Sequence, residues 1–276
     1  MYCYGIENQL LEFKRRLEKA IIEKGGEGKT SIIRSSGLIN LIHDAVKYEL
    51  IKNKVNLNNI KPALGERSPE IKLAGYFKQK DQDVCVIPSN MKKSPTQITW
   101  GPLAFENKID PYGYEYSENT LVINVRSQIT SLAKNTDTLF ERTFAEALNL
   151  HMRYKNIVLG EVYLIPVYEY DDKSISKKEI KFKNNNINLE KYISFFSAIS
   201  KRDINEEDNK YERCALLIVD FSKTVPKLYK NSQELKADKL ISSSFPLEYA
   251  DISFDNFVED LLEVYEKRFC IENLRM

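Results

Sequence analysis

The stretch from residue 120 to residue 170 constrains the fold most, because three regular elements follow one another there. Residues 120–128 alternate apolar and polar side chains, which is typical of a half-buried strand. Residues 137–153 place apolar side chains on one stripe with a period of 3.6, as in an amphipathic helix. Residues 157–168 are apolar almost throughout, as in a strand covered on both faces. This order predicts a mixed α/β core.

We therefore expect an α/β fold of the mixed α+β kind, with a central mixed β-sheet flanked by helices. The chain has 276 residues and shows neither an internal repeat nor a clear linker, so we expect a single domain over 1–276. Its N-terminal part, 1–65, is predicted to be helical. Two polar stretches, 89–119 and 171–188, are predicted to be loop-like insertions.

The remaining predicted elements are read from hydrophobic periodicity and from Gly and Pro positions. Thr136 or Asp137 is the expected N-cap of the helix over 137–153, and the first helix is expected to stop at Gly25 and Gly26. A short helix is expected to start at Pro69 and to carry Glu70. The other predicted helices cover 6–24, 36–53, 189–200 and 254–269, and the other predicted strands cover 84–88 and 214–221.

Composition and motifs argue against several classes of function. Forty-one basic and 40 acidic residues give a net charge of +1, which neither demands nor excludes a nucleic-acid partner. Only two histidines are present, so a hydrolase triad or a histidine-rich metal site is poorly supported. The stretch Gly25–Thr30 lacks the first glycine of a phosphate loop and follows a helix instead of a strand.

The expected location is the cytoplasm. The four cysteines are scattered without paired spacing, which favours reduced thiols. The N-terminus does not have the pattern of a signal peptide, and no apolar stretch approaches the roughly 20 residues that span a bilayer.

Polar side chains at two strands are the candidate functional residues. Asp83 stands at the mouth of the strand over 84–88, where it is well placed to hold a metal. Asn124, Arg126 and Gln128 share the polar side of the strand over 120–128. A solvated strand face is the other interpretation of these three side chains.

This arrangement resembles the PD-(D/E)XK nuclease superfamily and, within it, the type II restriction endonucleases. In that family a helix with a glutamate precedes a strand that opens with aspartate. A strand with acid-x-lysine, a helix and another strand follow. The resemblance implies that Asp83 holds Mg²⁺ and that Glu70 assists. Asn124 would replace the acid as a neutral metal ligand, Arg126 would replace the lysine, and Gln128 would orient a water.

The departures from the family pattern have chemical consequences. Asparagine carries no charge, so metal affinity falls unless Glu70, Glu141 or Glu146 compensates. Arginine stabilises a phosphate but is a poor general base, because its pKa lies well above 12. The site is therefore either a variant nuclease site with a relocated carboxylate or a degenerate site that only binds.

The resemblance implies a Mg²⁺-dependent, sequence-specific endonuclease of double-stranded DNA. It would act as a homodimer, because palindromic targets match a two-fold axis, and would be paired functionally with a cognate DNA methyltransferase. Lys92, Lys93, Trp100 and Tyr114 in the 89–119 insertion are the candidate DNA contacts. The alternative is a non-catalytic DNA-binding or regulatory protein on the same scaffold. A metabolic enzyme of unrelated α/β fold has no motif in its favour.

Overall fold

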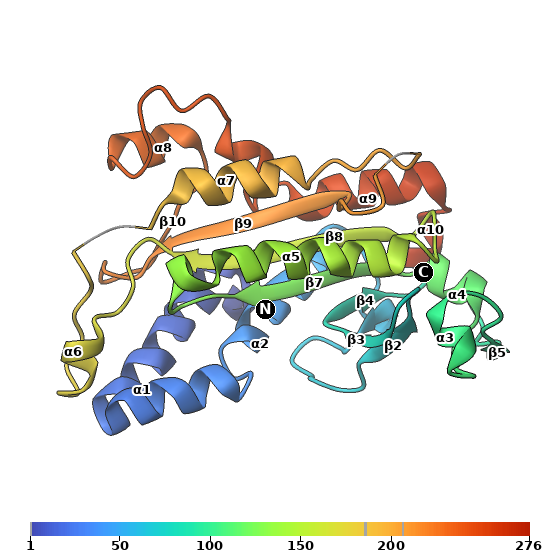
Figure 1. The fold of residues 1–276 in the computed structure, drawn as a ribbon, viewed down its shortest axis with the longest axis horizontal. Coiled ribbons are helices and arrows are strands. Elements are labelled where there is room, and N and C mark those ends of the chain that lie inside the picture. Colours follow the sequence, from blue (N-terminus) through green and yellow to red (C-terminus); the bar gives the residue numbers. More distant parts are fainter. Residues whose placement is uncertain (1, 185–186, 206) are drawn as a thin grey trace.

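A six-stranded sheet with helices on both faces forms the centre of the molecule (Figure 1). The computed structural model describes residues 2–184, 187–205 and 207–276. The order of the strands is β1-β4-β7-β8-β9-β10. Their bounds are β1 (Ile60–Lys61), β4 (Val84–Val86), β7 (Leu121–Ser127), β8 (Val158–Pro166), β9 (Arg213–Asp220) and β10 (Lys227–Leu228). The prediction of a mixed α/β chain with a central mixed sheet is confirmed.

The middle of the sheet is parallel and its margins are antiparallel. β7 pairs in parallel with β8, and β8 pairs in parallel with β9. β4 is antiparallel to β7, β1 to β4 and β10 to β9. Helix α5 (Leu132–His151) connects β7 to β8, so the predicted strand–helix–strand unit is confirmed. All nine residues of β8 are buried, as expected for a strand covered on both faces.

Two apolar layers hold the helices against the sheet. On one face, α1 (Ile6–Arg34), α2 (Ile39–Lys52) and α9 (Phe257–Arg268) contribute buried side chains to a common cluster with β7 and β8. On the other face, α5 and α7 (Leu189–Ala198) pack against the same strands and β9. Figure 1 shows α5 in front of β7 and β8, and α7 running alongside β9. The central strands are therefore enclosed between two helical layers.

Smaller elements lie outside the central sheet. Two are two-stranded antiparallel ladders, and the others are short helices. Their bounds are β2 (Ile71–Ala74), β3 (Gln79–Gln82), β5 (Thr96–Gln97), β6 (Ile109–Asp110), α3 (Pro102–Phe105), α4 (Tyr114–Glu118), α6 (Asp172–Ile175), α8 (Ser232–Ala237) and α10 (Glu272–Arg275), with 3₁₀ turns at Tyr2–Tyr4, Leu57–Asn59 and Tyr249–Ile252. Within the described residues, no helix is long and apolar enough to cross a membrane.

The predicted short helix carrying Glu70 is wrong, because this stretch forms strand β2. Ile71 and Leu73 are buried while Lys72 between them is exposed, which is a period of two and not 3.6. β2 pairs with β3 over four residue pairs. Glu70 lies directly before this hairpin and is exposed.

Two predicted helix ends are also wrong. α5 begins at Leu132, and its N-cap is Ser131, which has a φ of 56° and makes no side-chain cap bond. Thr136 lies inside the helix, where its hydroxyl donates to the Leu132 carbonyl at 2.8 Å, and Asp137 follows it. α1 does not end at the two glycines. Gly25, with a φ of 57°, interrupts the helix, which then resumes and continues to Arg34.

The two predicted insertions contain more regular structure than a loop. Residues 89–119 include β5, α3, β6 and α4. Residues 171–188 include α6, and an isolated bridge joins Tyr170 to Phe182. Positions 185 and 186 of this second stretch lie outside the described residues. The sequence missed these elements because each is only two to five residues long, too short to show a period.

Gly160 of β8 gives a direct test of the packing between the sheet and α9. A Cβ atom there would lie 2.7 Å from Leu261 Cδ1 and 2.8 Å from Phe257 Cζ, and both side chains are fully buried. We expect Gly160→Ala to lower the free energy of unfolding by about 1–3 kcal/mol through overpacking. Urea denaturation followed by circular dichroism measures the change.

Gly26→Ala is the matched control. Nothing lies within 4 Å of a Cβ atom at this helical position, so the substitution should stabilise the helix by up to about 1 kcal/mol. Equal effects of the two substitutions would contradict the tight contact described for β8.

Candidate active site

Asp83 lies in the short bend between β3 and β4, and a backbone hydrogen bond fixes its carboxylate. Its Oδ2 accepts from the amide N of Val125, in the middle of β7, at 2.8 Å. The preceding hairpin and β4 thus place this half-buried carboxylate beside Asn124, the next residue back along β7. The structure thus brings together Asp83 and Asn124, two of the predicted site residues.

Asn124 pairs in register with Glu161 of β8. Asn124 is 2% exposed and Glu161 is fully buried. Neighbours in register on two paired strands project to the same face of a sheet. A buried amide and a buried carboxylate therefore stand side by side under helix α5.

Three oxygen atoms in this pair have no hydrogen-bond partner among the described residues: Asn124 Oδ1 and both carboxylate oxygens of Glu161. The Tyr211 hydroxyl lies close enough to act against the rise in the pKa of Glu161, but it donates its proton to the Thr143 carbonyl at 3.1 Å. Burying an unpaired acceptor costs about 1–3 kcal/mol, and more when it is charged. Acceptors that point together without donors are suited to a cation or a bound water.

Burial raises the pKa of Glu161 to about 7, in the same direction as the repulsion from Asp83 and against the attraction of Arg126 and Lys80. The carboxyl group is therefore close to half protonated near neutral pH. A bound cation would favour the charged form. Glu161 is thus a carboxylate whose charge depends on what binds beside it.

A chain of alternating charges extends from Glu161 to the hairpin. Arg126 Nε lies 3.5 Å from Glu161 Oε1, and the Arg126 guanidinium also donates to Glu146 of α5. Glu146 Oε2 accepts a second bond from Lys80 Nζ of β3 at 2.6 Å. Burial, followed by the Arg126 charge, lowers the pKa of Lys80. Arg126 and Lys80 are therefore joined through one shared carboxylate.

Burial acts to lower the pKa of Arg126, but Glu161, Tyr211, Asp83 and Tyr163 together outweigh it, so that the pKa is shifted upward. Its guanidinium remains charged and engaged with two carboxylates. Gln128 lies just past the end of β7, where it accepts from the Tyr163 hydroxyl at 3.0 Å and donates to the Ser131 carbonyl at 3.3 Å. The predicted water-orienting side chain is thus held by two hydrogen bonds.

An open cleft of about 550 Å³ leads to Arg126 from the end of β7. Polar groups from the sheet and from α5 line one side of it, and Ile33 and Ile39 of the two N-terminal helices line the other. The polar lining residues are Arg126, Ser127, Gln128, Thr138, Arg142 and Tyr163. Arg142 is exposed, so the cleft presents a second guanidinium to an incoming ligand.

Glu70 lies near Asp83 but on the outside of the hairpin. Partial burial and then the neighbouring Asp83 and Asp81 raise its pKa. Within the described residues, no three His, Cys, Asp or Glu side chains gather closely enough to hold a metal by themselves. Any metal here would rely on two carboxylates at most, together with an amide oxygen, water and the ligand.

His43 of α2 approaches the same place from the other face of the sheet. Burial lowers the pKa of its imidazole, while Asp83 acts in the opposite direction. Its Nε2 has no hydrogen-bond partner among the described residues. The proximity of this histidine to Asp83 was not predicted from the sequence.

The four predicted DNA contacts lie in the β5–β6 region. Trp100 and Tyr114 are 44% and 45% exposed, and Lys92 and Lys93 are exposed. Trp100 packs beside Tyr76 at the turn of the β2–β3 hairpin, with the two ring centroids 5.4 Å apart. Their exposure leaves them available to a ligand.

Two residues of the candidate site, Lys80 and Glu161, were missed from the sequence. Glu161 has a recognisable signal, because it is the only charged residue in an apolar run from Ile157 to Val167, and such residues are rarely buried without a function or a partner. Lys80 has no comparable signal. It stands among the charged and amide residues 78–83, and only the hairpin shows that it faces inward.

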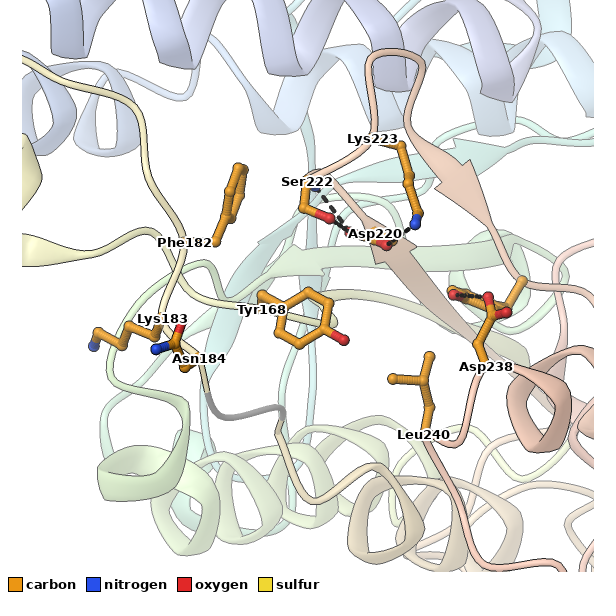
Figure 2. A pocket seen from close by; sticks show the side chains of 10 residues that line it. Tyr168, Phe182, Lys183, Asn184, Asp220, Ser222, Lys223, Asp238 and Leu240 are labelled. Carbon is orange, nitrogen blue, oxygen red and sulfur yellow. Dashed lines mark hydrogen bonds and ion pairs between the residues drawn. The ribbon is translucent and has the colours of Figure 1, made fainter.

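A second open cavity, of about 460 Å³, lies beyond the C-terminal ends of β8 and β9 (Figure 2). Its two carboxylates already have partners. Asp220 accepts from the Ser222 amide and hydroxyl at 2.8 and 2.6 Å, and Asp238 accepts from the Tyr229 hydroxyl at 2.6 Å. The cavity therefore lacks the unpartnered acceptors that distinguish the Asp83 site.

Comparison with known protein families, with curated proteins and with solved structures finds no match to this chain.

The buried charge of Glu161 predicts a pH-dependent stability. Between pH 4.5 and about 7 the folded protein holds a proton that the unfolded chain releases, so the contribution of Glu161 to stability falls as the pH rises through this window. Glu161→Gln removes this titrating group. The unfolding free energy of the variant minus that of the wild type should therefore increase by up to about 3 kcal/mol between pH 4.5 and about pH 8.

Urea denaturation without divalent metal, repeated across this pH range, measures the difference. Glu141→Gln is the control, because Glu141 is an exposed carboxylate on α5 and should give a nearly constant difference. A flat profile for Glu161→Gln would show that Glu161 is not held in the environment described.

Proposed function

We propose that this chain is a Mg²⁺-dependent endonuclease of double-stranded DNA, of the sequence-specific type II restriction kind. The observation that carries the proposal is the set of buried oxygens on Asn124 and Glu161 that accept no hydrogen bond from the described residues, beside the anchored Asp83 carboxylate. Mg²⁺ is commonly held by one or two carboxylates, with water and substrate phosphate completing its shell. The residues present therefore fit this ion.

The order of the elements also supports the proposal. Four elements follow one another in the order that the nuclease family uses. They are the strand opened by Asp83 (β4), the antiparallel strand that bears Asn124 and Arg126 (β7), helix α5 and the parallel strand β8. Here the acid expected on β7 is absent, and the carboxylate at the same level stands on β8 as Glu161. A relocated carboxylate would restore the charge that Asn124 lacks.

Each side chain of the site has a separable role in this proposal. Mg²⁺, when bound, would polarise the scissile phosphate and acidify a water. Asp83 stays oriented through the Val125 amide. Asn124 offers a neutral oxygen, and Glu161 offers a carboxylate that burial keeps free of water. Arg126 offsets the charge of Glu161, so that the site is not strongly negative before DNA arrives.

The biological setting follows from the same proposal. A palindromic DNA target would be cut by two copies of the chain related by a two-fold axis. The cognate methyltransferase would protect the host target, and both would act in the cytoplasm. Lys92, Lys93, Trp100 and Tyr114 would contact DNA outside the catalytic site.

A second candidate function is DNA binding without cleavage. Asn124 in place of an acid, and an Arg126 held by two carboxylates, favour it. Such a protein would bind DNA tightly in a salt-dependent and metal-independent manner and would leave the DNA intact.

Digestion of unmethylated phage DNA tests the proposal. The purified chain should give discrete fragments with Mg²⁺ and none with EDTA. Asp83→Ala should reduce the single-turnover cleavage rate by about a thousandfold, the scale expected from losing a group that stabilises transition-state charge, while the melting temperature stays close to that of the wild type.

Asp81→Ala is the matched control. Asp81 lies on the same hairpin, is exposed and pairs with Lys72 at 3.5 Å, so its loss should leave cleavage within about threefold. Intact DNA in every wild-type reaction, with metal-independent binding retained, would favour the second candidate function. Full cleavage by Asp83→Ala would remove Asp83 from the site.

A further inference from the structure

Lys80 belongs to a hairpin that lies outside the central sheet and is fixed to α5 at its turn and to β7 at its base. At the turn, Asn149 of α5 accepts from the amides of Phe77 and Lys78 at 2.8 and 3.1 Å. At the base, Asp83 is bonded to the Val125 amide. Between these anchors, Lys80 reaches Glu146 at 2.6 Å. The hairpin therefore presents Lys80 in a defined place.

The direction of Lys80 is set by its strand partner. Lys80 pairs in register with Leu73, which is fully buried, so both side chains face inward toward α5. Lys72, the neighbour of Leu73 on β2, faces outward, with a side chain that is 53% exposed against 30% for Lys80. An ammonium group is directed inward only at a cost in hydration, and Glu146 offsets that cost.

Arg126 occupies the place of the family lysine in the sequence, but its contacts restrict it. Its guanidinium binds Glu146 and also lies 3.5 Å from Glu161. A planar guanidinium held between two carboxylates suits a fixed structural charge. Among the described residues, Lys80 pairs with one carboxylate, that of Glu146, and shares it with Arg126. Glu146 can remain neutralised by Arg126 when Lys80 turns to a new anion.

The charges of the cluster also match a phosphodiester. Three carboxylates (Asp83, Glu146 and Glu161) face two cations (Lys80 and Arg126), which leaves one net negative charge when all are ionised. One Mg²⁺ ion would convert this to one net positive charge. A phosphodiester carries one negative charge, so the loaded site would be neutralised by its substrate.

We propose that Lys80, presented by the β2–β3 hairpin, supplies the cation that acts on the scissile phosphate and the attacking water, while Arg126 positions Glu161 and Glu146. This inference rests on the proposed nuclease function. The water oxygen forms a bond to phosphorus as the bond from phosphorus to the leaving deoxyribose oxygen breaks. The proton lost by water passes to solvent, and the leaving oxygen takes one up. Lys80 stays protonated and contributes its charge and its hydrogen bonds.

Four variants of the chain test this assignment: Lys80→Met, Lys80→Gln, Lys80→Arg and the control Lys72→Met. Three quantities are measured for each. They are the single-turnover cleavage rate with Mg²⁺, the affinity for the same DNA with Ca²⁺ in place of Mg²⁺, and the melting temperature. Lys80→Gln can still donate to Glu146, so it provides a neutral variant if Lys80→Met does not fold.

We expect Lys80→Met and Lys80→Gln to cleave at least about a hundredfold more slowly than the wild type, with DNA affinity within about threefold. Lys80→Arg should recover at least about tenfold of that loss, because it restores the charge. Lys72→Met should cleave like the wild type. A structural role for Lys80 would lower the melting temperature and the affinity together with the rate, and Lys80→Gln would then cleave as fast as Lys80→Arg.

The failures of the two proposals are distinguishable. A wild-type chain that cuts no DNA overturns both the nuclease function and the role of Lys80. A wild-type chain that cuts, together with Lys80→Gln that cuts at a similar rate, overturns only the role of Lys80. If Lys72→Met also lowered the cleavage rate a hundredfold, the effect would be a general one of positive charge on the hairpin. This result would also overturn the role of Lys80.

Discussion

The alternating charges of Glu161, Arg126, Glu146 and Lys80 hold three layers of the molecule in one place. They connect β8, β7, helix α5 and the β2–β3 hairpin through contacts at the centre of the site. Removing Arg126 would leave Glu161 buried without its charge partner, which costs several kcal/mol. Apolar packing attaches α5 to the sheet, but these charges determine which polar groups meet beneath it.

The Glu161 end of this series of charges is less well compensated than the rest. Glu161 receives an ion pair at 3.5 Å but no hydrogen bond from the described residues, and Asn124 beside it leaves its oxygen unpaired. A sequence selected for stability alone would favour an apolar pair at these two positions. The retention of two mutually adjacent acceptors is the kind of local conflict that occurs at functional sites.

The central unit was predictable from the sequence, and the hairpin was not. Strand β7, helix α5 and strand β8 extend over 7, 20 and 9 residues, long enough for their periodicity to determine their type. β2 has only four residues, and Ile71, Leu73 and Ala74 fit a helical spacing as well as a strand. The hairpin forms because β3 pairs with it and Asn149 caps its turn, and these are long-range contacts that no local pattern contains.

The same distinction explains which site residues could be found. Asp83 and Asn124 were identifiable because each belongs to a recognisable strand, and their proximity follows from one antiparallel pairing. Glu161 becomes relevant only when the register of β7 with β8 is known. A shift of one residue in that register would turn Glu161 to the opposite face of the sheet. A carboxylate on β8 can therefore take the place of one on β7 beside Asp83, provided that the register of the parallel pair is preserved.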